Sequence, residues 1–495
     1  MAKLGLETTV VNKTILGKTA KRFKERKIQL PTFEELSDPS KIPDDIVKKL
    51  QKIDPNEAHP LNLYRINWYN DPDGKGFLEV PYYFEVPKVI TGVDAKIVIM
   101  PGAFFPMVQC HKVLAAYGCL TPRLITGQFD PTTHKAIWPS TGNYCRGGVA
   151  VSRIMNCHGV AILPEEMSEE RFSWLKKWCI DPNNDIHKTH GCESNVKEIY
   201  DKCNELDKDP SNIIFNQFCE FGNTVIHYIC TGKALEKVFK DMQMKNSNLK
   251  LRAFTSATGS AGTISAGDYL KDNYEEFKIV AVEALECPTL LYNGFGGHNI
   301  QGIGDKHVPY VHNVMNTDNI AGIPDASTDS LYLLFNTDAG RKYLKKKGVT
   351  DKEIKNLALM GLSSICNMLA AIKTAKYYKM ETNDVVLTVA TDPAFMYKTE
   401  ASKQMKKYFE GNFDELDAAM CYGQHLKAVT IDHYIELTQV EKERIFNLGY
   451  YTWVEQQGVD VKDFNARRDQ KFWKDLKSYV PVWDKLIKEL NKKAK

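Results

Sequence analysis

The chain has 495 residues, of which 43% are hydrophobic and 26% are charged, with 65 Lys and Arg against 62 Asp and Glu. This composition is typical of a folded globular protein and excludes disorder over most of the chain. The net charge of +3 gives no electrostatic basis for binding nucleic acid. No apolar run reaches the roughly 18 residues that a membrane-spanning helix needs.

Residues 1–27 lack the apolar core of a signal peptide, so we expect a cytoplasmic protein. The 12 cysteines are then expected to be reduced thiols rather than a disulfide framework. Two Cys-His pairs, at 110–111 and 157–158, have residue types that bind zinc, but neither has a second ligand pair nearby. We therefore expect no metal site.

Residues 1–60 are charged and interrupted by prolines, with one helical stretch near 46–53, which indicates an N-terminal arm lying on a larger body. From 61 to 400, apolar runs alternate with helical patterns such as 363–379, and this alternation predicts an α/β fold. The apolar runs are continuous, as in strands that are buried on both faces of a parallel sheet. They are AKIVIM (95–100), GVAIL (159–163), KIVAVEA (278–284) and DVVLTVA (384–390).

Beyond residue 400 the pattern changes to helices rich in Lys, Glu and aromatic residues, and Thr438-Gln-Val-Glu441 fits a capping box that opens one of them. The segment from about 174 to 212 is charged and predicts a lid or an oligomer contact. We predict four parts, namely an N-terminal arm (1–60), two α/β domains (61–215 and 216–400) and a helical C-terminal extension (401–495).

Four loops carry residues suited to binding an anion or a small ligand. Pro139-Ser-Thr-Gly-Asn143 follows an apolar run and precedes a helical pattern, so hydroxyl, amide and backbone N–H groups meet there. Residues 257–265 are small enough for a phosphate to approach the backbone, and a helix is predicted to follow over 266–277. The other two are Asn299-Ile-Gln-Gly-Ile-Gly304 and Met360-Gly-Leu-Ser-Ser364. Taken singly, each is also explained by a helix cap or a tight turn.

Taken in order, these stretches resemble the cysteine synthase and cystathionine β-synthase group of fold type II enzymes, which use pyridoxal phosphate. The family's T-S-G-N loop is matched by S-T-G-N at 140–143, its M-S-x-E-R segment by M-S-E-E-R at 167–171, and its Q-Q-F segment with a later His and Thr-Gly by N-Q-F at 216–218, His227 and Thr231-Gly232. Its G-T-G-G-T-I phosphate loop is matched by G-S-A-G-T-I at 259–264, and its Q-G-I-G and G-I-S-S signatures by Q-G-I-G at 301–304 and G-L-S-S at 361–364. The resemblance covers about 95–400. It implies the tryptophan synthase β-like fold, with two open parallel-sheet α/β domains and the cofactor between them.

The resemblance also implies a catalytic lysine. In this family the Schiff-base lysine usually lies within the motif Ser-x-Lys-Asp-Arg, and that motif is absent here. Residues 104–112 nevertheless resemble the stretch that leads to it, and a gapless alignment on the Asn143 loop sets Lys112 on the family lysine. Burial would lower the pKa of this amine and make it a nucleophile. The alternative is that Lys112 is a surface lysine in a homologue that has lost its chemistry.

The remaining site residues follow from the same resemblance. Tyr144 stands where the family has a small Thr, so either the pocket differs there or Tyr144 is simply a packed aromatic. The residues implied to bind the cofactor are Lys112, Asn143, Gly259, Ser260, Ala261, Gly262, Thr263 and either Thr391 or Asp392. Those implied to bind the substrate are Ser140, Thr141, Gly142, Asn143, Tyr144 and Gln217.

The partner of the pyridine nitrogen is left open between Thr391 and Asp392, which follow the last predicted strand. A Thr hydroxyl would leave the ring neutral, which suits β-elimination and β-replacement. An Asp carboxylate would protonate the ring and strengthen the electron sink. We prefer Thr391, because Asp392 precedes Pro393 and is also explained as a turn residue.

The activity implied is β-replacement or β-elimination on a serine- or cysteine-like amino acid. One alternative is a same-fold enzyme with other amino-acid chemistry, such as a deaminase, a racemase or a carbon–carbon lyase, which Asp392 would favour. Another is a non-catalytic regulatory homologue. The expected partners are a small amino-acid substrate and a second copy of the chain in a homodimer, with no nucleic acid and no membrane.

Overall fold

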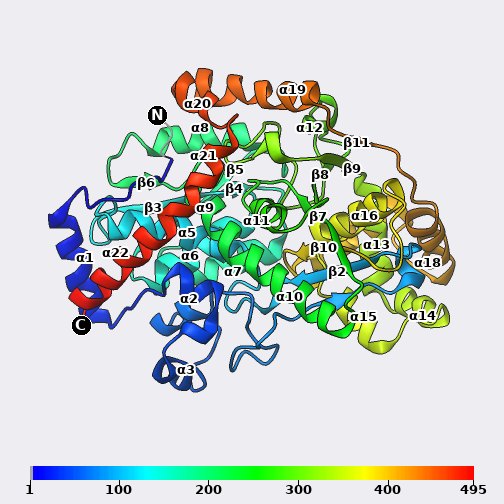
Figure 1. Ribbon diagram of the computed structural model, residues 1–495, viewed down its shortest axis with the longest axis horizontal. Coiled ribbons are helices and arrows are strands. Elements are labelled where there is room, and N and C mark those ends of the chain that lie inside the picture. The colour runs from blue at the N-terminus through cyan, green and yellow to red at the C-terminus, as the bar shows by residue number, and fades with distance from the viewer. Residues whose placement is uncertain (1–3) are drawn as a thin grey trace.

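The computed structural model describes residues 4–495 and builds them around two sheets (Figure 1). The larger sheet has seven strands in the order β1-β2-β10-β7-β8-β9-β11, and the smaller has four in the order β5-β4-β3-β6. The five inner strands of the larger sheet are parallel, whereas β1 and β11 pair antiparallel at its edges. The smaller sheet is entirely parallel. The predicted α/β architecture with two parallel-sheet units is confirmed.

All four apolar runs predicted as strands are strands, and no boundary is shifted by more than one residue. They are rich in Val, Ile and Ala, which suit a sheet buried on both faces. The larger sheet consists of β1 (Phe84–Glu85), β2 (Lys96–Pro101), β7 (Lys250–Ala257), β8 (Lys278–Ala284), β9 (Asn319–Ile323), β10 (Asp384–Ala390) and β11 (Tyr434–Glu436). The smaller sheet consists of β3 (Lys135–Pro139), β4 (His158–Pro164), β5 (Ile186–Thr189) and β6 (Asn212–Ile214).

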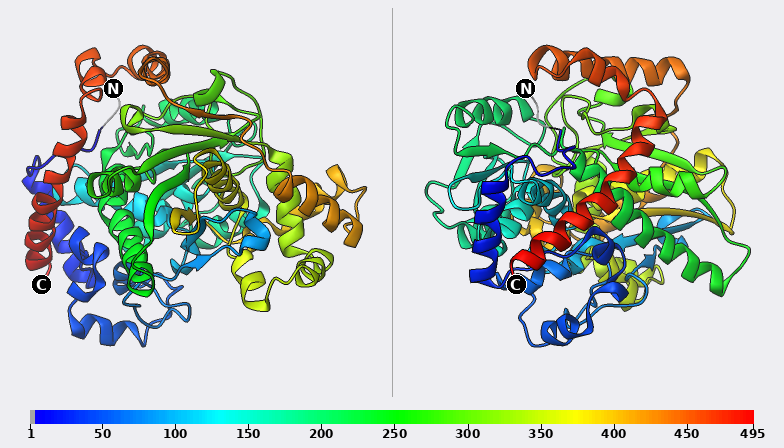
Figure 2. Two further views of the ribbon diagram at one scale, coloured as in Figure 1. Left: turned by 45° about the vertical axis from the view of Figure 1, so that its right-hand side comes forward. Right: turned by 60° about the vertical axis from the view of Figure 1, so that its left-hand side comes forward.

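Helices surround both sheets (Figure 2). Those interleaved with the smaller sheet are α5 (Lys112–Ile125), α6 (Asn143–Ile154), α7 (Glu169–Trp178) and α8 (Val196–Leu206). The chain then forms α9 (Phe221–Ile226), a π-helical turn (His227–Thr231), α10 (Gly232–Lys245), α11 (Ser265–Asn273), α12 (Thr289–Tyr292), α13 (Asp325–Asn336), α14 (Asp338–Lys346), α15 (Asp351–Leu357) and α16 (Leu362–Tyr377). The helix expected over 266–277 is thus shorter than predicted, because Tyr274 adopts an extended backbone.

The sheets do not divide as the predicted domain boundaries do. Although they fall within 61–215, β1 and β2 belong to the larger sheet, whose other strands come from beyond residue 216. The chain therefore begins the larger sheet, leaves it to build the smaller one, and returns. Composition cannot reveal this, since an apolar run reports burial and not which strand lies beside it. The extension 401–495 also contributes a strand, β11, to the larger sheet.

The two ends of the chain pack against each other. The first helices are α1 (Lys13–Arg26), α2 (Phe33–Ser37), α3 (Asp44–Leu50) and α4 (Lys88–Thr91). The last are α17 (Lys398–Tyr408), α18 (Glu415–Tyr422), α19 (Gln439–Tyr450), α20 (Val461–Ala466), α21 (Gln470–Asp475) and α22 (Tyr479–Lys493). Helix α22 packs on α1 and α2, and the Asp484 carboxylate accepts the backbone N–H groups of Phe33 and Glu34 at 2.7 and 3.2 Å. Thr438 and Glu441 form the predicted capping box at α19.

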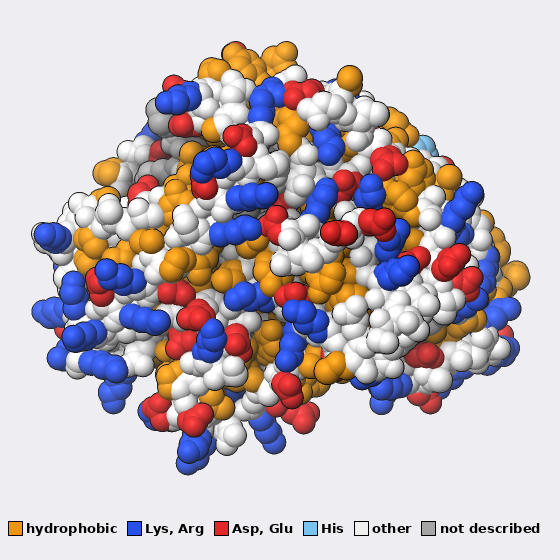
Figure 3. Space-filling view, viewed as in Figure 1, with side chains coloured by type: hydrophobic (Ala, Val, Ile, Leu, Met, Phe, Trp, Pro, Cys, Tyr) orange, Lys and Arg blue, Asp and Glu red, His pale blue; other side chains and the backbone are white. Residues whose placement is uncertain are grey.

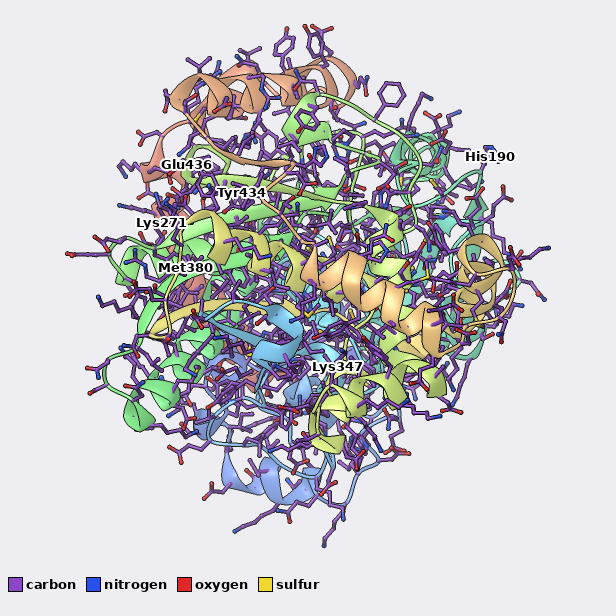
Figure 4. The ribbon with its side chains drawn as sticks, turned by 90° about the vertical axis from the view of Figure 1, so that its right-hand side faces the viewer. His190, Lys271, Lys347, Met380, Tyr434 and Glu436 are labelled. Carbon is purple, nitrogen blue, oxygen red and sulfur yellow. The ribbon has the colours of Figure 1, made fainter. Side chains whose placement is uncertain are left out.

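Figure 4 shows the outer edges of the two sheets at opposite sides of the view, with Tyr434 and Glu436 of β11 on one side and His190, just beyond β5, on the other. All twelve cysteines are free thiols, and only Cys192 is not fully buried. Within residues 4–495 no single helix is long and apolar enough to span a bilayer. The pair α15 and α16 meets that test together, by length and composition, but is bent by 111°.

Candidate active site

The predicted lysine and the predicted phosphate loop meet in the structure. Lys112 is the first residue of α5, and its Nζ donates a hydrogen bond to the Ser260 Oγ at 2.9 Å. Ser260 lies on the loop between β7 and α11, which begins at Ser265. Desolvation by the surrounding protein lowers the pKa of Lys112. The amine can therefore lose its proton more readily than an exposed lysine can.

Close contacts explain why this loop is made of small residues. A Cβ on Gly262 would lie 2.0 Å from the Asn223 Oδ1, and one on Gly259 would lie 2.7 Å from the Gly302 carbonyl oxygen. Ala261 has a left-handed backbone, with φ of 62°. Since neighbouring segments press on both sides of the loop, larger side chains are excluded and the backbone stays accessible to an anion.

The neighbour of the lysine, His111, is a supporting residue. Its Nε2 lies 3.0 Å from the Thr263 Oγ1, and its ring stacks on Trp68 with the centroids 5.2 Å apart. Burial lowers the pKa of His111 to about 3, so the ring stays neutral at physiological pH. His111 thus ties the lysine segment to the phosphate loop without adding a charge.

The Asn loop faces the end of β10. Ser140 and Thr141 are buried, the Ser140 Oγ accepts the Gly142 N–H at 3.0 Å, and Asn143 begins α6. The Asn143 side chain donates to the Asp392 Oδ2 at 2.8 Å. Gly142 has φ of 143°, and a Cβ there would lie 2.6 Å from the Arg171 Cδ. The backbone at this position therefore depends on glycine.

Of the two alternatives after β10, Asp392 is already engaged. Its carboxylate accepts from Asn143 and from the Tyr397 hydroxyl, whose oxygen lies 2.9 Å from the Oδ2, and the Arg171 Nη2 lies 3.6 Å away. Thr391 is half-buried, and its backbone N–H donates to the Ser364 Oγ at 3.0 Å. Asp392 thus joins α6, α7 and the end of β10 in one charged network.

Two residues predicted to bind the substrate, Gln217 and Tyr144, lie in different surroundings. Gln217 is 4% exposed, and its Oε1 is buried without a hydrogen-bond partner among the described residues, as expected of a side chain that waits for a ligand. Tyr144 does not join the site. Its ring packs on Trp138 with the centroids 5.4 Å apart, and its hydroxyl donates to the Phe215 carbonyl at 3.2 Å. Tyr144 is therefore a packed aromatic of the smaller-sheet unit.

Three ionisable residues near the site had no role in the sequence analysis. Arg171 is fully buried and bridges Asp392 to the Gln301 amide oxygen, and its position within M-S-x-E-R was the signal that could have marked it. Burial raises the pKa of Glu193 to about 8 and that of Asp305 to about 7. The Arg171, Thr141 and Lys112 side chains offset these shifts only in part. No sequence pattern distinguished these two acids.

Known proteins are similar to this chain in sequence and in fold. The chain is 30% identical to "Cysteine synthase B" of Campylobacter jejuni over 263 residues, which cover 51% of this chain and 75% of that protein. It is 28% identical to "Cysteine synthase" of Staphylococcus aureus over 239 residues, covering 48% of this chain and 68% of that protein. No protein-family model matches the chain.

Among solved structures, an O-acetylserine sulfhydrylase of Entamoeba histolytica superposes with a TM-score of 0.53 at 23% identity, covering 70% of this chain and 93% of that one. A hydrogen sulfide-producing enzyme of Fusobacterium nucleatum superposes with a TM-score of 0.53 at 21% identity, covering 64% of this chain and 96% of that one. These likenesses concern the fold.

Proposed function

This chain belongs to the cysteine synthase family, and we propose that it is a pyridoxal-phosphate enzyme that catalyses β-replacement or β-elimination on a serine- or cysteine-like amino acid. The observation that carries the proposal is the hydrogen bond between Lys112 and Ser260. Residues 148 positions apart are thereby brought together, one at the start of a helix and one in a loop of small residues. This chain lacks the usual motif around the lysine, so similarity to the family alone would not predict the contact between Lys112 and Ser260.

The residues present fit pyridoxal phosphate. The loop 259–263 offers backbone N–H groups and two hydroxyls at the start of a helix, which suits a phosphate. The Gln217 Oε1 is unpartnered and can accept a hydrogen bond from an amino-acid ligand. The Lys112 amine has a lowered pKa, which suits attachment of a carbonyl cofactor. When bound, the cofactor supplies an electron sink for negative charge at the substrate Cα.

Lys112 would hold the cofactor and would also move the substrate proton. Because desolvation lowers its pKa, the amine loses its proton more readily than an exposed lysine does, and the neutral amine can take a proton from the substrate Cα. Ser260 accepts the hydrogen bond that orients the amine, and Asn223 donates to the same hydroxyl at 3.1 Å. His111 remains neutral and holds the Thr263 hydroxyl, so it would not compete for that proton.

The substrate carboxylate would bind at the Asn loop. The hydroxyls of Ser140 and Thr141 lie just before α6, and the helix N-terminus adds a favourable dipole. Contact with Arg171 fixes the backbone at Gly142, which orients the loop. Gln217, which is buried, would add a hydrogen bond from its amide N–H group.

Thr391 remains our choice for the pyridine nitrogen. The Asp392 carboxylate is occupied by Asn143, Tyr397 and Arg171, and turning it toward another group would leave the buried Arg171 charge without its partner. A neutral hydroxyl at that nitrogen supports elimination and replacement over more carbanionic chemistry.

The test is to record the absorbance of the purified protein, reduce it with borohydride and map the modified peptide. We expect a cofactor absorbance band, with the cofactor attached at Lys112. The band should be lost in Lys112→Ala but not in the exposed control Lys135→Ala. O-acetylserine with sulfide, L-serine and L-cysteine are then tested for turnover. Cofactor bound at another lysine, or turnover surviving in Lys112→Ala, would overturn the proposal.

We extend the proposal to a homodimer that acts in the cytoplasm on a small amino acid, without nucleic acid or a membrane. The free cysteines support a reducing compartment, and the near-neutral net charge gives no basis for a nucleic-acid partner. Light scattering on the purified protein tests the dimer, for which a monomeric mass at micromolar concentration is the contrary result.

A further inference from the structure

A cavity of about 210 Å³ lies where the C-terminal helices cover the back of the phosphate-loop region. One wall comes from α9, the π-helical turn and α11, and the other from α21, residues 476–477 and the first turn of α22. Figure 1 shows α21 and α22 crossing this part of the molecule. The cavity is smaller than the roughly 300–1,000 Å³ of sites for drug-sized ligands, so it suits a compact molecule.

The lining combines an apolar surface with two carboxylates, Asp268 and Asp272. Val225, Ile229 and Trp473 supply much of the apolar wall. Asp268 enters from α11, and its Oδ1 accepts amide hydrogens from Asn313 and Asn316 at 3.2 and 2.5 Å. In the described part of the chain, no hydrogen bond reaches its other oxygen and no cationic side chain pairs with it.

Neighbouring charges are already neutralised or lie in solvent. Asp272 pairs with Lys477 at 2.7 Å and accepts the Tyr228 hydroxyl at 2.8 Å, and Lys271 pairs with Asp318. Lys474 at the rim is exposed. Figure 3 shows both signs of charge mixed with hydrophobic side chains over this face of the molecule. Asp268 is thus the unbalanced charge of the cavity.

A second polar atom also faces this region without a partner. The Thr224 side chain is 4% exposed and lines the cavity, and its Oγ1 has no hydrogen-bond partner among residues 4–495. Buried hydroxyls are usually bonded, so an unpartnered one in a cavity wall points to a missing partner. Burial raises the pKa of Asp268 to about 7, and neither the amide hydrogen bonds nor the nearby Lys271 charge offsets this effect in full.

We propose that this cavity binds a small organic ammonium ion with an apolar body. Its N–H would donate to the Asp268 carboxylate, and its hydrocarbon part would pack on Val225, Ile229 and Trp473. An ammonium group would supply the counter-charge that Asp268 lacks, and aromatic walls favour cations. This site is separate from the lysine loop and does not depend on the proposed activity.

The cavity also adjoins the phosphate loop. Thr224 follows Asn223, which donates to the Ser260 hydroxyl that Lys112 contacts. The Thr224 carbonyl accepts the hydroxyl of Ser265, the first residue of α11. An occupant would therefore contact two segments that hold the loop.

The test uses three six-membered-ring probes of similar shape, namely N-methylpiperidine (a cation), cyclohexylmethanol (neutral) and cyclohexanecarboxylate (an anion). A tertiary amine forms no imine with an aldehyde, so its binding does not report on a cofactor site. Calorimetric titration at pH 8 should show the cation binding about tenfold or more tighter than the neutral probe. Equal binding of cation and neutral probe, preferential binding of the anion, or no binding would overturn the proposal.

Three variants locate the binding. Asp268→Asn keeps the shape and should weaken the cation about tenfold while leaving the neutral probe unchanged. Val480→Phe fills the cavity and should weaken both probes, which covers the case in which the first variant does not fold. Asp475→Asn, an exposed acid outside the lining, should change neither. Undiminished cation binding in folded Asp268→Asn or in folded Val480→Phe would refute the assignment.

Discussion

Glu193 should make the protein less stable as pH rises through neutrality. The residue follows β5 and is 1% exposed. Burial raises its pKa to about 8, against roughly 4.3 for an exposed glutamate. Between these values the folded protein keeps a proton that the unfolded chain has released, so unfolding becomes easier with each increase in pH.

The magnitude follows from the two pKa values. One proton of difference corresponds to about 1.4 kcal/mol of stability per pH unit within the window. The interval from pH 5.5 to pH 7.5 lies inside this window but approaches both pKa values. Over this interval Glu193 should therefore cost the folded state about 2.5 kcal/mol. Glu193→Gln removes this titration but keeps the size of the side chain.

The assay is urea unfolding of wild type and Glu193→Gln at the two pH values. The variant should gain about 2.5 kcal/mol relative to wild type on going from pH 5.5 to pH 7.5. Other buried acids, such as Glu283, titrate in both proteins and cancel in the difference. Glu166→Gln, an exposed acid of the adjoining loop, is the control and should show no such gain. A stability difference that stays constant with pH would refute the reasoning.

Two further substitutions test the packing of the chain ends. Trp453→Ala removes a fully buried indole that ties the extension to the body and should cost about 3–5 kcal/mol in urea unfolding, whereas Tyr451→Ala, 66% exposed, should cost little. Equal losses would contradict this. Gly127→Ala should lower the melting temperature more than Gly348→Ala does. Both positions have positive φ, but only at Gly127 would a Cβ meet the Asn12 carbonyl oxygen, at 2.2 Å. Similar shifts for both variants would show that the N-terminal arm does not press on this glycine.

Much of the fold could be predicted because its elements are locally encoded. The run 278–284 coincides with β8 and the run 384–390 with β10, since buried parallel strands need continuous apolar residues. The capping box at Thr438 is likewise a contact between residues three positions apart. Strand order could not be predicted, because β2 meets β10 across almost three hundred residues and nothing in either run specifies its neighbour.

The candidate site also has a part that could be predicted from the sequence and a part that could not. The Asn143 loop and the 259–263 loop are short motifs with a characteristic composition, so the sequence marked them. Tyr144 directly follows one of those motifs, yet its side chain packs outside the site, because consecutive residues of a helix point to different faces. Glu193 stands in no motif, and only the folded chain brings it near Thr141.

The network around Asp392 explains how the two sheet units are held in contact. Arg171 comes from α7 and Asn143 from α6, both beside the smaller sheet, whereas Asp392 follows β10 of the larger sheet. A buried arginine and a buried aspartate are each costly alone, so the pair is stable only while both units stay in contact. The same contact keeps the Asn143 loop opposite the end of β10. The charge pair therefore holds together the two halves between which the substrate would bind, and it does so without placing a free charge in the pocket.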